Sequence, residues 1–259
     1  MQKQPSPRRK LRSATVALAR LAGASFILFT LTSARADEAS CPDAIGSIET
    51  NGAALAFPKG GVGRPLDILA IGSSSTEGIG ASSPANAYPA RLEDELAKQA
   101  GIDAEVKNAG IGGELAAKTL ERLKSALKSG WARLVIWQVG TNDALVGVDE
   151  ALFRATVEAG VAAVRAAGVP LVLIDPQMRL VSPDAARYER YVAIVDEVGA
   201  EHRVPVLSRY AMMKSWAAKG AKALASLLSH DGLHMNDLGY RCLAHTLAEA
   251  IEGVAAAKL

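Results

Sequence analysis

Four short polar segments of the sequence contain residue types that can carry out acyl-transfer chemistry. A serine hydroxyl attacks a carbonyl carbon when a base such as histidine takes its proton, and the carbonyl oxygen then needs N–H donors as it becomes negative. The segments are residues 72–78 with three serines, 108–113 with three glycines, 140–143 with an asparagine, and 231–234 with an aspartate and a histidine. Taken singly, each also has an ordinary explanation as a turn, a helix cap or half of a metal site.

The elements that would position these segments alternate regularly between strand and helix. Short apolar runs predict strands over residues 66–71, 104–106, 134–139, 171–174 and 204–207. The longer runs are apolar on both faces, which is typical of buried parallel strands. Amphipathic stretches predict helices over residues 89–99, 115–127, 150–167, 184–201 and 238–257, with Asp149 as a cap of the third.

This alternation predicts an α/β fold, a three-layer α/β/α sandwich with a five-stranded parallel sheet. Sites in such sheets lie at the carboxyl ends of the strands. The first three polar segments all follow predicted strands, so the fold itself would bring them together.

As an ordered set, the four segments resemble the sequence blocks of the SGNH (GDSL-like) hydrolase family, over about residues 66–250. In the family pattern Gly-Asp-Ser-Leu-x-x-Gly, Gly72 aligns with the first glycine and Gly78 with the last, which places the nucleophile on Ser74. The other blocks map onto Asn108-x-Gly110-x-x-Gly113, Gly140-x-Asn142-Asp143 and Asp231-x-x-His234. Any one block is a weak match, whereas the set of four is specific.

The resemblance implies a role for each matched residue. Ser74 would attack the ester, His234 would act as its base, and Asp231 would orient His234. The oxyanion hole would consist of the backbone N–H groups of Ser74 and Gly110 and the side-chain amide of Asn142. The family also implies the flavodoxin-like SGNH hydrolase fold and ester hydrolysis with no cofactor and no metal ion.

The sequence departs from the family pattern on both sides of the predicted nucleophile. Ser73 stands where the family has aspartate and Ser75 where it has leucine, so three serines are adjacent. Only Ser74 lies two residues after Gly72 and four before Gly78, and this spacing selects it. The aspartate is expected to brace the turn rather than to react, so its loss leaves open what supports the turn.

Metal binding is an alternative use of the fourth segment. His230, Asp231 and His234 are potential zinc ligands. Because no further Cys/His cluster in the sequence supports such a site, we predict no metal and no cofactor.

The N-terminal residues predict export. Five basic residues within the first twelve precede an uncharged, mostly apolar run at residues 21–32, and Ala34 and Ala36 are the small residues that a signal peptidase needs. The apolar run would rise only about 18 Å as a helix, too short to span a bilayer. We predict a signal peptide over residues 1–36, cleaved after Ala36, then a lead-in segment over 37–64 and one hydrolase domain over 65–259. The mature protein would be periplasmic or secreted.

Removal of the signal peptide changes the charge of the protein. The chain has 29 basic and 27 acidic residues, and 7 of the basic ones lie within residues 1–36. The mature part keeps 22 basic against 27 acidic residues, a net charge of −5. A net negative charge gives no indication of nucleic-acid binding. The predicted partner is a small-molecule or polysaccharide acyl ester substrate, with no nucleic acid and no stable membrane span after signal cleavage.

Cys41 and Cys242 are the two cysteines of the sequence, and both would lie in an oxidising compartment. Two states remain open. One is a disulfide that ties the start of the mature chain to the last helix, and the other is one buried and one free thiol.

The substrate is less well defined by the sequence than the reaction. Loops after the fourth and fifth strands, with Gln177, Met178, Arg179 and Tyr188, are expected to set specificity, whereas the helical spacing within residues 210–216 favours core packing over a substrate groove. By resemblance to exported enzymes of this kind, we predict a carbohydrate O-acetyl or short-chain acyl esterase. Alternatives on the same triad are a lysophospholipase or thioesterase and a periplasmic O-acyltransferase. The alternative from another class is a non-catalytic glycan-binding protein on a degenerate hydrolase scaffold.

Overall fold

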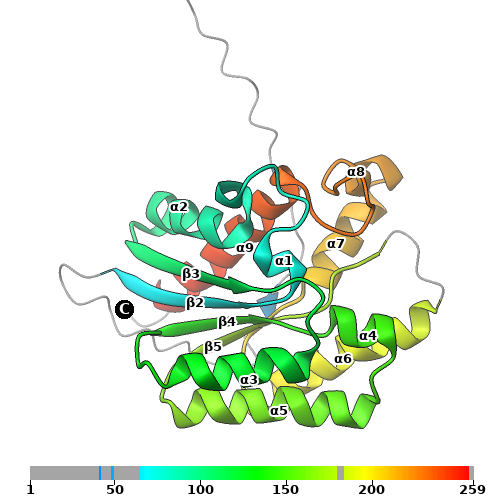
Figure 1. Cartoon of the computed structure of the whole chain (residues 1–259). Coiled ribbons are helices and arrows are strands. Elements are labelled where there is room, and N and C mark those ends of the chain that lie inside the picture. Colours follow the sequence, from blue (N-terminus) through cyan, green and yellow to red (C-terminus); the bar gives the residue numbers. More distant parts are fainter. Residues whose placement is uncertain (1–40, 42–47, 50–64, 180–183, 257–259) are drawn as a thin grey trace, which may run out of the picture. The chain divides into compact units, whose positions relative to one another are not determined.

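A central β-sheet organises the part of the chain that the structure describes (Figure 1). The structure is a computed structural model that describes residues 41, 48–49, 65–179 and 184–256, all within one compact unit, Ala39–Leu259. The predicted signal peptide and most of the predicted lead-in segment lie outside the described residues, so both remain predictions.

Five strands of the sheet are parallel, as predicted. They are β2 (Leu66–Gly72), β3 (Ala104–Gly110), β4 (Leu134–Gln138), β5 (Leu171–Ile174) and β6 (Val206–Leu207). A sixth strand, β1 (Ile48–Glu49), was not predicted and pairs antiparallel with β6. The order β1-β6-β5-β4-β2-β3 places β3 and β4 on opposite sides of β2. The crevice of such a sheet therefore opens at the carboxyl end of β2, where the chain switches sides.

Helices cover both faces of the sheet and give the predicted three layers (Figure 1). One face carries α2 (Tyr88–Ala100) and α9 (Asp237–Ala256), and the other carries α3 (Ala116–Leu127), α5 (Glu150–Ala166) and α6 (Ala185–His202). Successive side chains of a strand point to opposite faces. Accordingly, Ile68 and Ala70 belong to one buried core, and Leu69 and Ile71 belong to the other.

The five predicted helices begin and end within one residue of the predicted positions. Local capping sets two of these boundaries. The side chains of Asp149 and Asp184 accept hydrogen bonds from the backbone N–H groups of Leu152, at 3.0 Å, and Arg187, at 2.9 Å. These bonds satisfy N–H groups that have no partner within the helix, and the one at Asp149 confirms the predicted cap.

The described residues also form short helical elements that were not predicted. They are α1 (Ser74–Glu77), the 3₁₀ turn η1 (Pro84–Asn86), α4 (Thr141–Val146), α7 (Arg209–Ala218) and α8 (Ala221–Ala225). In α7, Met213 and Trp216 are fully buried, which confirms core packing for these two residues, and Tyr210 is half-buried. Among the helices described, none combines the length and the apolar character that a membrane span requires.

Candidate active site

The turn after β2 makes Ser74 the first residue of α1. Two glycines shape this turn. A Cβ on Gly72 would lie 2.4 Å from Thr76 Oγ1 and 2.8 Å from Gln138 Oε1, so no side chain fits there. Gly78 follows α1 with a φ of 102°, in the left-handed region that favours glycine. The spacing from which Ser74 was predicted therefore has a steric and conformational basis.

Ser74, His234 and Asp231 form a hydrogen-bonded chain across the top of the sheet. His234 Nε2 lies 2.9 Å from Ser74 Oγ, and His234 Nδ1 lies 2.6 Å from Asp231 Oδ2. The fold thus joins two predicted residues that are 160 positions apart. When Nδ1–H donates to the carboxylate, Nε2 presents a lone pair to the serine hydroxyl, which is the tautomer that a general base needs.

The Asp231 carboxylate is held by several further donors. Its Oδ1 accepts hydrogen bonds from Ser229 Oγ at 2.7 Å and from the N–H groups of Leu233 and His234 at 2.9 Å each. Partial burial raises the pKa of Asp231, but the hydrogen bonds from His234, Leu233 and Ser229 outweigh it and hold that pKa well below its ordinary value. Asp231 is therefore an anion at working pH and can stabilise a protonated His234.

Gln138 supports the turn in place of the missing aspartate. Its Oε1 accepts hydrogen bonds from the N–H of Ser73 at 3.0 Å, from Ser73 Oγ at 3.2 Å and from Thr76 Oγ1 at 3.3 Å. A backbone N–H can only donate, so it fixes the Gln138 amide with its oxygen toward the turn. A neutral amide at the end of β4 thus supplies the acceptor that the sequence left unexplained.

Asn142 lies in the first turn of α4, directly above the end of β4. Its Nδ2 donates to the carbonyl oxygen of Glu114 at 2.8 Å. An amide nitrogen carries two hydrogens, so this bond orients the group and leaves a second N–H for a ligand. The predicted position of Asn142 as an oxyanion donor is compatible with this geometry.

Gly110, whose N–H was predicted to be an oxyanion donor, lies at the end of β3. Its N–H donates to Asn108 Oδ1 at 2.9 Å, so it already has an acceptor. A Cβ on Gly110 would lie 2.0 Å from Glu77 N, because α1 packs directly against this end of β3. The glycine is needed for that close approach.

Gly113, three residues further along, lies in the better position for a donor. A Cβ on the preceding Gly112 would lie 3.8 Å from Ser74 Cβ, and the following residue, Glu114, is hydrogen-bonded to Asn142. Gly113 has a φ of 77°, and within the described part of the chain its N–H meets no acceptor. The loop 111–114 therefore passes between Ser74 and Asn142.

Charged side chains that were not predicted from the sequence hold this loop from both sides. Glu77 Oε2 accepts from the N–H of Gly112 at 2.6 Å. On the other side, Arg122 pairs with Glu114 at 2.5 Å and also donates to the carbonyl oxygen of Ala109 at 2.8 Å. Because Glu114 and Arg122 are both largely shielded from solvent, their pairing is less screened than a surface ion pair.

The residues expected to set specificity divide into two groups. Gln177 and Tyr188 are buried, at 1% and 4% exposure. They do not form a substrate surface, so their predicted role in specificity is wrong. Tyr188 donates its hydroxyl to the carbonyl oxygen of Gln177 at 2.7 Å. Met178 and Arg179 are half-buried and remain candidates.

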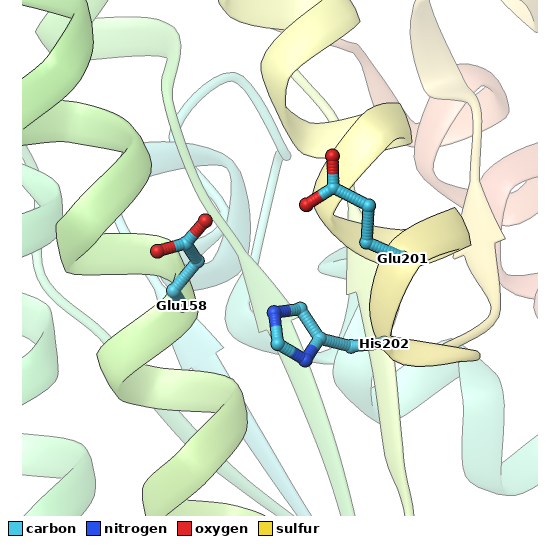
Figure 2. Close-up of side chains that lie close together, drawn as sticks. All are labelled: Glu158, Glu201 and His202. Carbon is cyan, nitrogen blue, oxygen red and sulfur yellow. The ribbon is translucent and has the colours of Figure 1, made fainter.

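A separate group of acidic and histidine side chains lies away from this site. Figure 2 shows Glu158 on α5 facing Glu201 and His202 on α6. Their potential ligand atoms lie within 4.8 Å of one another. Arg154 donates to Glu158 at 3.2 Å and to Glu201 at 2.9 Å. The Arg154 guanidinium pairs with both carboxylates, so the group links the two helices through ion pairs.

Comparisons with known proteins agree with this fold. The "Thioesterase 1/protease 1/lysophospholipase L1" of Escherichia coli (strain K12) is 28% identical over 186 residues, covering 71% of this chain and 83% of that one. The crystal structure of AlinE4, described as an SGNH-hydrolase family esterase, is 26% identical with a TM-score of 0.55, covering 73% of this chain and 96% of that one. A two-domain esterase described as active on acetylated mannans has a similar fold, with a TM-score of 0.61, 21% identity, and coverage of 74% of this chain and 50% of that one.

The fold and these relatives define an SGNH-type serine hydrolase that acts on ester bonds. The model of the Non-GDSL lipase-like family matches residues 48–257, and the chain belongs to this family. Its name agrees with Ser73 and Ser75, which stand where the GDSL pattern has aspartate and leucine.

Proposed function

We propose that the protein hydrolyses esters through an acyl-enzyme on Ser74. The observation that carries the proposal is the chain Ser74–His234–Asp231, with contacts of 2.9 and 2.6 Å. Ser74 Oγ attacks the carbonyl carbon while His234 Nε2 takes its proton, and His234 then gives that proton to the leaving alcohol. Water attacks the acyl-enzyme, again losing a proton to His234, and the acid leaves as Ser74 recovers its hydrogen.

The oxyanion hole in this proposal contains Gly113 rather than Gly110. The donors would be the backbone N–H groups of Ser74 and Gly113 and the second N–H of Asn142. Three features favour this set: the engaged N–H of Gly110, the unengaged N–H of Gly113, and the orientation of Asn142 by Glu114. Each preformed donor is worth about 3–4 kcal/mol of transition-state stabilisation.

The substrate we propose is a carbohydrate O-acetyl or other short-chain acyl ester outside the cytoplasm. The disulfide between Cys41 and Cys242 supports an oxidising location. A second candidate substrate is an ester or thioester with a longer acyl chain, as in the lysophospholipase relative. It is favoured by Ile111, 45% exposed in the loop beside Ser74, and by Val146, 66% exposed at the end of the helix that carries Asn142.

A series of p-nitrophenyl esters from acetyl to dodecanoyl tests both the reaction and the chain length. Ser74→Ala should lower kcat by about a thousandfold or more on every ester, since it removes the nucleophile. Ser129→Ala, a change at an exposed serine in the loop after α3, is the matched control and should keep wild-type rates. A maximum of kcat/KM at acetyl supports the short-chain substrate, and a maximum beyond octanoyl supports the second candidate.

Labelling by a fluorophosphonate, followed by mass spectrometry of the peptides, tests the residue itself. We expect one label, on Ser74. A label on Ser73 or Ser75, or equal hydrolysis by wild type and Ser74→Ala, would contradict the proposed nucleophile.

A further inference from the structure

The side chain of Gln177 connects the turn that carries Ser74 to the loop that carries His234. Gln177 follows β5 and is buried under the site. Its Oε1 accepts a hydrogen bond from Ser75 Oγ at 2.7 Å, and its Nε2 donates to the carbonyl oxygen of Leu233 at 2.9 Å. Ser75 directly follows Ser74, and Leu233 directly precedes His234. The side-chain amide of Gln177 therefore links the residue after Ser74 to the residue before His234.

The orientation of this amide is fixed by a buried guanidinium. Arg209, the first residue of α7, is fully buried, and its Nη1 donates to Gln177 Oε1 at 3.2 Å. Because a guanidinium has only donors, the oxygen of Gln177 must face it, and Nε2 must face Leu233. Arg209 Nη2 is itself held by the carbonyl oxygen of Asp175 at 3.0 Å.

The same network reaches the proposed oxyanion donor. Thr141, the residue before Asn142, accepts from Arg209 Nη2 at 3.3 Å and from the N–H of Gln177 at 3.4 Å. Three chain segments that carry the reacting groups thus share one buried polar cluster. Hydrogen bonds join its members directly, and in such clusters removal of one member disturbs the others.

We propose that Gln177, oriented by Arg209, is a positioning residue that holds the Ser74 turn and the His234 loop at the distance needed for proton transfer. The proposal rests on the catalytic roles proposed above for Ser74 and His234. It also assigns a purpose to Ser75, which replaces the leucine of the family pattern. The Ser75 hydroxyl attaches the Ser74 turn to Gln177.

A double-mutant cycle between Ser75 and Gln177 separates this bridge from ordinary packing. Ser75→Ala removes one arm of the bridge, and Gln177→Met removes both while keeping a similar volume. Gln177→Glu keeps an acceptor for Ser75 and Arg209 but loses the donor to Leu233, and it serves if Gln177→Met does not fold. The cycle is measured with p-nitrophenyl acetate and, independently, as the rate of fluorophosphonate labelling of Ser74.

Each single change should lower kcat and the labelling rate about tenfold, with KM within twofold, because a small misplacement of the base slows the chemical step. Ser75→Ala in the Gln177→Met background should cost less than a further twofold, since Gln177→Met has already removed the acceptor of Ser75. Thr156→Ala, which removes a hydroxyl-to-backbone hydrogen bond within α5 and none of the cluster, should leave both rates unchanged.

Two outcomes would overturn the proposal. One is a double variant whose loss is the product of the single losses, which would mean independent effects. The other is single variants that fold and label Ser74 at the wild-type rate. A failure of the proposed function is distinguishable, because Ser74→Ala would then retain activity whatever the behaviour of Gln177.

Discussion

The hydroxyls of the three adjacent serines contact different partners. Ser73 donates to Gln138 in β4, Ser74 contacts His234, and Ser75 donates to Gln177. Two serine–glutamine pairs flank the proposed nucleophile, one on each side, and both flanking serines are buried. The family's aspartate and leucine are thus replaced by a neutral polar support, with no carboxylate next to Ser74 on either side.

Asn142 allows the most direct test of the proposed oxyanion hole, since the other donors are backbone groups. Asn142→Ala should lower kcat about a hundredfold or more with little change in KM, because the donor acts on the charge that develops in the transition state. Steady-state kinetics on p-nitrophenyl acetate measure this. Asn142→Asp, which keeps the size but replaces the donor by an acceptor, should lose at least as much. Rates within threefold of wild type for either variant would remove Asn142 from the oxyanion hole.

At the scale of elements, the helices and strands with a clear hydrophobic period were predicted from the sequence. The elements that depend on contacts between residues far apart in the chain were missed. The five long helices and the parallel strands follow from amphipathic spacing and apolar runs. The two-residue strand β1 and the four-residue α1 are too short to show a period. Helix α7 has an irregular polarity pattern, because the charged residue Arg209 lies buried together with Met212, Met213 and Trp216.

The residues of the site also divide into those that were predicted from the sequence and those that were missed. Ser74, His234, Asp231 and Asn142 were predicted because ordered sequence blocks contain them. Gln138 and Gln177 were missed as supports because their partners lie 65 and 102 positions away, and a lone glutamine carries no local pattern. The fully buried Arg209 contradicts the ordinary expectation that arginine is exposed, so only the assembled fold reveals it.

Close packing between α5 and β4 gives a prediction at the scale of elements. Gly160 lies in α5, and a Cβ there would come within 1.9 Å of Trp137 Cζ3, an atom of a fully buried ring. Helix propensity alone would make Gly160→Ala stabilising by about 1 kcal/mol, whereas overpacking costs typically about 1–3 kcal/mol. With so short a contact, we expect overpacking to dominate and the free energy of unfolding to fall by about 2 kcal/mol in urea titrations.

A matched substitution on the same helix calibrates the propensity term. Ala162 is exposed on α5, so Ala162→Gly should cost only about 1 kcal/mol. If Gly160→Ala instead raised the free energy of unfolding by a similar amount, the close packing of Trp137 against α5 would be wrong.

At the scale of the whole molecule, the residues described before β2 are attached to the rest of the fold by a strand pairing and a disulfide. Strand β1 pairs with β6 at the sheet edge, and Cys41 is bonded to Cys242 of α9 with a Cα–Cα distance of 5.3 Å. Of the two cysteine states that the sequence left open, the structure contains the disulfide. Cys242 is buried in the core between the sheet, α2 and α9, so the bridge anchors residues that precede the predicted domain boundary at 65.

This disulfide should stabilise the protein without affecting its chemistry. It spans 201 positions, and closing so long a loop in the unfolded chain is worth up to about 5 kcal/mol. The double variant Cys41→Ala/Cys242→Ala should therefore unfold at much lower urea concentration while keeping the kcat of the wild type. Adding a reductant to the wild type should lower its Tm, and adding it to the double variant should change nothing. An equal response of the two proteins to the reductant would show that the bridge contributes no stability, and a loss of kcat would show that the segment before β2 also shapes the site.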